Sequence, residues 1–201
     1  MHKKTDLRIL RTKQSIRKAF YELIQEKGYE SITIQDIADR AIINRNTFYL
    51  HYQNKPDLLE TCINELLSEL KDAVVLCPVS MNPFSISILE TVMKTVLEHI
   101  SCNKTFYYAM LIEENRIYQF RAKMENIIKD KLNGVGDPSQ GQSHLAISKE
   151  LLLEYLVSAF MGVVNWWIKN DQPLSVEEAS SQFSRIVSYG HLKAAGILVE
   201  E

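Results

Sequence analysis

Residues 33–55 read TIQDIADRAIINRNTFYLHYQNK, and this stretch determines the fold expected for the chain. Thr33 and Asp36 have the spacing of a capping box, and apolar residues follow on one face at helical spacing. Asn44 is a good N-cap for a second short helix, because its side chain can accept a hydrogen bond from an unpaired backbone N–H. The stretch therefore predicts two short helices joined by a tight turn.

The second helix has one apolar face and one polar face. Phe48 and Tyr52 lie four residues apart, so we expect both to point into the core. The other face carries a cation, an amide and hydroxyl groups, which can contact phosphates and base edges in the major groove of DNA. The sequence leaves two roles open for His51, which are a contact to a phosphate and packing in the protein interior. The pattern is typical of a DNA-binding regulator.

Three segments of the first sixty residues resemble the DNA-binding domain of the TetR family. They are KQSIRKAF at 13–20, KGYESITIQDIA at 27–38 and TFYLHYQNKPDLL at 47–59. The resemblance implies a three-helix helix-turn-helix head, a helical regulatory body and a homodimer bound to a palindromic operator.

The same resemblance implies a set of DNA-binding residues. By position they are Thr33, Arg45, Asn46, Thr47, Tyr49, His51 and Lys55. Lys55 would contact a phosphate at the start of the next helix, and Thr33 would contact the DNA backbone at the start of its own helix.

One position departs from the family pattern. The family often has glycine in the turn, where this chain has Ile42. A β-branched residue is strained at positive φ. We therefore expect either a turn of another shape or an Ile42 that is not left-handed.

The charge distribution favours the same function. Residues 1–55 hold 11 Lys and Arg against 6 Asp and Glu, whereas the remainder holds 12 against 19. A basic head is attracted to phosphate and an acidic body is repelled by it, so the charges orient the chain on DNA. Lys3, Lys4, Arg8 and Arg11 precede the expected first helix. They form either a flexible arm over the DNA or a solubilising tail.

Composition and length limit the class of protein. The chain has 201 residues with only 7 Gly and 5 Pro, which is typical of a globular protein. Helical periodicity dominates, and we predict an all-α fold with a helix-turn-helix DNA-binding domain at 1–55 and a helical ligand-binding and dimerisation domain at 56–201. The 3 cysteines show no paired spacing and no signal peptide is recognisable, so we expect a cytoplasmic protein.

The penultimate helix carries the strongest pattern in the body. Residues 151–168 are apolar almost all round, so the helix should be buried on every face. Ser158 and Gly162 lie four apart and permit close approach of another helix, with Asn165 nearby as a polar group that sets the register. We predict that this helix and the last one form a four-helix dimer interface. An internal Glu154 argues against a membrane span.

Several apolar residues are candidates for lining a ligand pocket between the body helices. They are Met93, Phe106, Met110, Tyr118, Phe160 and Trp167. Ordinary core packing is the alternative for each. We expect no metal or cofactor, because His99 and Cys102 lack the spacing of a tetrahedral site. No enzyme motif is recognisable.

The sequence therefore predicts a TetR-type transcriptional regulator that binds a palindromic operator as a homodimer, and it leaves open whether a small apolar effector releases it and whether it represses or activates. The alternative is a helical dimeric adaptor or coactivator that acts through protein partners and has no specific operator. Specific DNA affinity that falls steeply with salt would favour the regulator.

Overall fold

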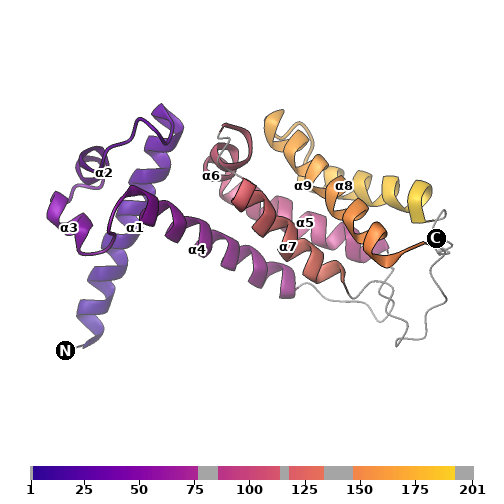
Figure 1. Ribbon diagram of the computed structural model, residues 1–201, viewed down its shortest axis with the longest axis horizontal. Coiled ribbons are helices and arrows are strands. Elements are labelled where there is room, and N and C mark those ends of the chain that lie inside the picture. The colour runs from indigo at the N-terminus through magenta and orange to yellow at the C-terminus, as the bar shows by residue number, and fades with distance from the viewer. Residues whose placement is uncertain (1, 77–85, 114–117, 134–146, 193–201) are drawn as a thin grey trace. The chain divides into compact units, whose positions relative to one another are not determined.

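The computed structural model describes residues 2–76, 86–113, 118–133 and 147–192, and within these ranges it contains helices and no strand. The prediction of an all-α fold is confirmed. In chain order the helices are α1 (His2–Lys27), α2 (Ile34–Arg40), α3 (Arg45–Tyr49), α4 (Lys55–Leu76), α5 (Ile86–Cys102), α6 (Lys104–Tyr108), α7 (Tyr118–Leu132), α8 (Lys149–Lys169) and α9 (Val176–Ile186) (Figure 1). Two π-helical segments follow α6 and α9, at Ala109–Glu113 and Val187–Leu192.

The chain divides into two compact units. Unit 1 comprises residues 1–66 and 105–114, and unit 2 comprises residues 67–104 and 115–201. The predicted domain boundary after residue 55 falls at the start of α4, whose first half belongs to unit 1. The roles predicted for the two domains remain predictions.

The core of unit 1 is built on one face of α1. That face buries Ile16, Ala19, Phe20, Leu23 and Ile24, at the spacing of a helical stripe. α2 adds the buried Ile37 and Ala38, and α3 adds Phe48. Phe48 and Tyr52 are both buried, which confirms the predicted apolar face of the second short helix.

α1 begins earlier than the sequence predicts. It starts at His2, so Lys3, Lys4, Arg8 and Arg11 lie within the helix and the prediction of a flexible arm is wrong. Residues 2–11 contain no glycine or proline to interrupt the helix. The side chains of Arg8 and Arg11 are exposed.

The turn between α2 and α3 contains a strained residue. Ile42 has φ of 56° and is 91% exposed. Its N–H donates to the Asp39 carbonyl at 3.2 Å, and the Ile43 N–H donates to the Ala38 carbonyl at 2.9 Å. These two bonds define a Schellman motif with isoleucine at the position that usually holds glycine. Both alternatives that the sequence suggested for Ile42 are therefore wrong.

Within unit 2, α8 contacts α7 and α9. The buried side of α8 comprises Leu152, Leu153, Leu156, Val157, Phe160, Met161, Val164, Trp167 and Ile168. Among the helices that the structure describes, α8 is the one that is long and apolar enough to cross a membrane, with a mean hydropathy of 1.5, but half of its apolar stretch is buried within the protein. Buried core helices of soluble proteins have the same character.

The end of α8 is tied to the start of α9. The Trp167 indole N–H donates to the Leu174 carbonyl at 2.8 Å, which closes the connection between the two helices. Ser175 and Glu178 form a capping box at the start of α9. α9 then packs along α5. Ser184 of α9 and Ser188 of the π-helical segment that follows it are both buried.

Candidate nucleic-acid interface

A side-chain cap fixes the N-terminal end of each of the helices α2 and α3. The Asp36 N–H donates to the Thr33 hydroxyl at 3.1 Å, and the Thr33 N–H donates to the Asp36 carboxylate at 2.7 Å. The Asn46 N–H donates to the Asn44 side-chain oxygen at 2.8 Å. Both predicted caps are confirmed. Because the caps and the buried Phe48 determine the start and rotation of α3, they also determine which of its side chains face outward.

The outer face of α3 gathers most of the predicted site residues. Arg45, Asn46 and Tyr49 are exposed, whereas Thr47 and His51 are half-buried. All five lie on α3 or on the turn that follows it. The structure therefore brings these predicted residues together on one short helix and the turn that follows it.

Arg45 and Tyr49 contact each other on this face. The Arg45 Nη2 donates to the Tyr49 hydroxyl at 3.1 Å, and the guanidinium carbon lies 5.7 Å from the centre of the Tyr49 ring. The Tyr49 ring lies edge to face against Phe48, with ring centres 5.7 Å apart. The exposed cation is thus connected to the core through two aromatic rings.

The surroundings of His51 favour the neutral form of its imidazole. Its partial burial lowers the pKa of the imidazole, and the nearby Lys13 lowers it further. A neutral imidazole can donate one hydrogen bond to a phosphate oxygen. A phosphate at this position would in turn favour the protonated form.

Thr33 has internal partners for both of its donors. Its hydroxyl donates to the Asp36 carboxylate at 2.7 Å, and its backbone N–H donates to the same carboxylate. A phosphate contact by Thr33 would need one of these donors. The contact to the DNA backbone remains a prediction, and the capping role is what the structure shows.

Lys55 also has internal partners. Its ammonium donates to the Tyr29 carbonyl at 2.8 Å and to the Glu30 carbonyl at 3.2 Å. It lies 4.3 Å from the centre of the Tyr29 ring. Lys55 therefore fixes the start of α4 against the loop that follows α1, and its phosphate contact stays a prediction.

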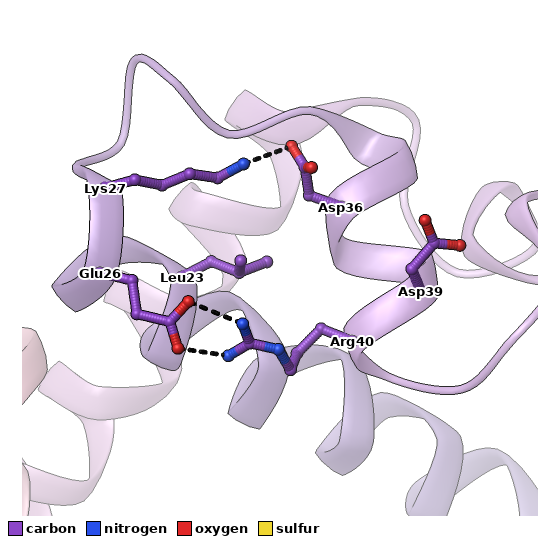
Figure 2. A pocket seen from close by; sticks show the side chains of 6 residues that line it. All are labelled: Leu23, Glu26, Lys27, Asp36, Asp39 and Arg40. Carbon is purple, nitrogen blue, oxygen red and sulfur yellow. Dashed lines mark hydrogen bonds and ion pairs between the residues drawn. The ribbon is translucent and has the colours of Figure 1, made fainter.

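A charged groove between α1 and α2 was not predicted. It has a volume of about 500 Å³ and is lined by Leu23, Glu26, Lys27, Asp36, Asp39 and Arg40. Figure 2 shows Arg40 reaching the Glu26 carboxylate with both terminal nitrogens, at 2.7 and 2.6 Å, and Lys27 reaching Asp36. These pairs fix α2 against α1 and so support α3. The sequence offered no guide to them, because their partners are 9 to 14 residues apart.

Two carboxylates of this groove, those of Asp36 and Glu26, are held in their charged form. The Lys27 ammonium, followed by the Thr33 cap, holds the pKa of Asp36 well below its usual range. The hydrogen bond from Arg40 lowers the pKa of Glu26. Both pairs are exposed, so their role is to orient the helices, with little net stabilisation.

A second candidate surface lies on unit 2. α8 exposes Leu151, Tyr155, Ser158, Gly162 and Trp166, which share one face at helical spacing. α9 and the segment after it expose Ile186 and Tyr189, and a groove of about 460 Å³ is lined by Gln182, Arg185, Ile186 and Tyr189. This stripe of α8 is open in the isolated chain, so burial of α8 on every face would need a partner, and it remains a prediction together with the dimer interface.

The three predicted interface residues lie on or beside this stripe. A Cβ atom added to Gly162 would meet nothing within 4 Å, so the chain's own packing does not require a glycine there. The Asn165 side-chain oxygen is buried and has no hydrogen-bond partner among the described residues. Ser158 is exposed.

The predicted pocket residues fall into both units. Phe106 and Met110 belong to unit 1, where Phe106 contacts the Tyr21 ring at 4.7 Å between centres. Met93, Phe160 and Trp167 belong to unit 2. All five are buried, which fits a pocket wall and ordinary core equally well. The side chain of Tyr118 lies outside the described residues. The pocket remains a prediction.

Within the described ranges, no group of three or more His, Cys, Asp and Glu residues is placed to hold a metal ion. Cys62 is buried in unit 1, and burial raises the pKa of its thiol to about 11. Cys102 is exposed on α5. Cys77 lies outside the described residues.

Comparison with known proteins gives consistent matches. Residues 16–62 match the model for bacterial regulatory proteins of the tetR family, and residues 89–189 match a model described as transcriptional regulator C-terminal region. The uncharacterised HTH-type transcriptional regulator YxbF of Bacillus subtilis strain 168 is 38% identical over 100 residues, which are 49% of this chain and 26% of YxbF. The chain therefore spans about a quarter of that relative's length.

Solved structures share the fold over nearly the whole chain. A TetR transcriptional regulator from Streptococcus agalactiae 2603V is 25% identical, with a TM-score of 0.63 over 91% of this chain and 97% of that one. The regulator FadR from Bacillus subtilis, solved with stearoyl-CoA, is 18% identical with a TM-score of 0.64 over 87% of this chain and 96% of that one. At that identity the second likeness shows the fold alone.

The helical fold and the capped α2–α3 unit define a helix-turn-helix transcriptional regulator. The chain belongs to the TetR family.

Proposed function

We propose that two copies of this chain bind a palindromic operator, each placing the outer face of α3 in the major groove of one half-site. The observation that carries the proposal is the Asn44-capped α3, which is anchored by the buried Phe48 and exposes Arg45, Asn46 and Tyr49. Helix-turn-helix proteins use this element for base contacts. Thr47 and His51 complete the proposed DNA-facing set, and Thr33 and Lys55 flank it.

The exposed stripe of unit 2 supports the dimer. Leu151 is 63% exposed on α8 and Ile186 is 62% exposed on α9. Large apolar residues that share a face mark interaction sites. A glycine inside a helix costs about 1 kcal/mol relative to alanine, and Gly162 gains nothing from its own chain in return. A partner helix that crosses at Gly162, beside Ser158 and Asn165, would account for both observations.

A small apolar effector that lowers operator affinity is the second part of the proposal. The FadR neighbour solved with stearoyl-CoA supports it, and the buried Met93, Phe160 and Trp167 of unit 2 are compatible with a pocket wall as well as with ordinary core. An effector can act only through different affinity for the DNA-bound and free conformations. Stearoyl-CoA, whose acyl chain is apolar although its CoA group is charged, is one probe: release of the operator duplex would support an acyl chain as the bound group, and unchanged binding would remove acyl-CoA from consideration. The proposed function also implies that the protein is cytoplasmic.

Selection of bound duplexes from a random pool tests the proposed function. The full chain should enrich a palindrome whose half-site centres lie about one helical turn or slightly more apart. Affinity for that palindrome should fall steeply with salt, because each neutralised phosphate releases counterions. Failure to enrich any sequence, together with salt-independent binding, would support the adaptor alternative.

A further inference from the structure

Tyr49 holds Arg45 in one position on the outer face of α3. The hydroxyl of Tyr49 accepts from the guanidinium at 3.1 Å, and the ring lies beneath the guanidinium carbon at 5.7 Å. Phe48, which is completely buried, meets the Tyr49 ring at an interplanar angle of 89°. A long and flexible side chain is thereby attached to the core of unit 1.

The remaining donors of Arg45 are available for a ligand. A guanidinium has several N–H donors in a planar fork, and Tyr49 uses a single one of them. Arg17 pairs with Glu65, and Arg40 pairs with Glu22 and Glu26. Within the part of the chain that the structure describes, Arg45 pairs with no carboxylate. Arg45 is therefore oriented by Tyr49, and no carboxylate among the described residues neutralises its charge.

We propose that Arg45 recognises a guanine in each operator half-site, and that Tyr49 is the positioning residue that holds Arg45 for this contact. The inference rests on the proposed function. Guanine presents O6 and N7 as paired acceptors in the major groove, and an arginine fork is the commonest partner for that pair. Arg45 is the first residue of α3, and the first residues of a recognition helix are those that reach base edges. A side chain that is already oriented loses less conformational freedom on binding.

Guanine substitution in the selected duplex tests the contact. The probe is the palindrome that the wild-type chain recovers from a random pool, with each guanine replaced in turn by 7-deazaguanine, which lacks N7 but still pairs with cytosine. At one symmetry-related guanine, the replacement should weaken wild-type binding about tenfold or more. Arg45→Ala should bind more weakly from the start and show no further loss at that guanine.

Two results would overturn the guanine contact. Either every guanine tolerates the replacement, or Arg45→Ala is as sensitive to it as the wild type. A chain that enriches no duplex would instead contradict the proposed function, so the two failures are distinguishable. Arg121→Ala is the matched control, because Arg121 is an exposed arginine of α7 that pairs with Glu125.

The positioning role of Tyr49 has its own test. Tyr49→Phe keeps the ring but removes the hydroxyl, and Tyr49→Ala removes both. Discrimination between guanine and the other bases at the Arg45 position should fall in steps, with Phe between the wild type and Ala. If both variants weaken all duplexes equally and leave the guanine preference intact, Tyr49 contacts a phosphate and does not position Arg45. Thermal unfolding of each variant shows that the fold is retained.

Discussion

The Lys55 ammonium donates to the Tyr29 carbonyl at 2.8 Å and lies 4.3 Å above the ring of the same residue. Lys55 is the first residue of α4, and Tyr29 is buried just beyond the end of α1. One side chain therefore fastens two helices of unit 1 at the level of the loop that precedes α2. This contact changes the expected result of mutating Lys55.

Lys55→Met should destabilise unit 1. The substitution removes two hydrogen bonds and a cation–π contact, and we expect the free energy of unfolding to fall by about 1–2 kcal/mol. If holding the start of α4 is the only role of Lys55, the slope of operator affinity against salt should stay at the wild-type value. Urea denaturation and salt titration measure the two quantities. Lys18→Met, at an exposed position of α1, is the control. If the Lys55→Met variant shows a salt slope smaller by about 1 and unchanged stability, Lys55 contacts a phosphate.

Ile42→Gly should stabilise the chain. A non-glycine residue in the left-handed region costs on the order of 1–3 kcal/mol, and part of the gain is lost to the greater freedom of glycine in the unfolded chain. We expect a net gain of about 1 kcal/mol in the free energy of unfolding, measured by thermal or urea denaturation. Ile42→Val keeps the β-branch and should gain nothing. Equal stability of the Gly and Val variants would show that the turn is unstrained.

Gly162→Leu should separate the dimer without unfolding the chain. A Cβ atom at this position meets nothing of its own chain within 4 Å, whereas a leucine side chain would collide with a helix that crosses there. Sedimentation velocity should show a monomer, and operator affinity should fall although no proposed DNA contact has changed. Asn126→Leu, on the exposed side of α7, controls for added surface hydrophobicity. A Gly162→Leu chain that remains dimeric would place the interface elsewhere.

His51 should couple operator binding to pH. Burial and Lys13 lower the pKa of its imidazole in the free chain, and a nearby phosphate would raise it in the complex. Binding would then take up a proton, so affinity should increase as pH falls from about 8 to about 6 at constant salt. His51→Gln should remove this increase. The same pH dependence in the variant would mean that His51 does not face a phosphate.

The parts of the fold that depend on local chemistry were predictable from the sequence. Thr33 and Asn44 cap helices as expected, because a cap needs only its own side chain and the next backbone N–H groups. The rotation of α3 followed from Phe48 and Tyr52, because burial fixes the apolar face of a helix.

Features that depend on long-range contacts could not be predicted. Phe106 packs on Tyr21 in unit 1, 85 residues away along the chain, and no periodicity indicates such a pairing. The orientation of Arg45 depends on a rotamer that brings it to Tyr49. Ile42 adopts a conformation that its side chain disfavours, because two turn hydrogen bonds hold it there.

A crystal structure of the full chain with its selected duplex tests the central claim most directly. The account predicts two chains related by a twofold axis, each with α3 in the major groove and with Arg45 and Asn46 at base edges. A complex in which α3 lies away from the DNA, or in which a single chain contacts the whole site, would contradict it.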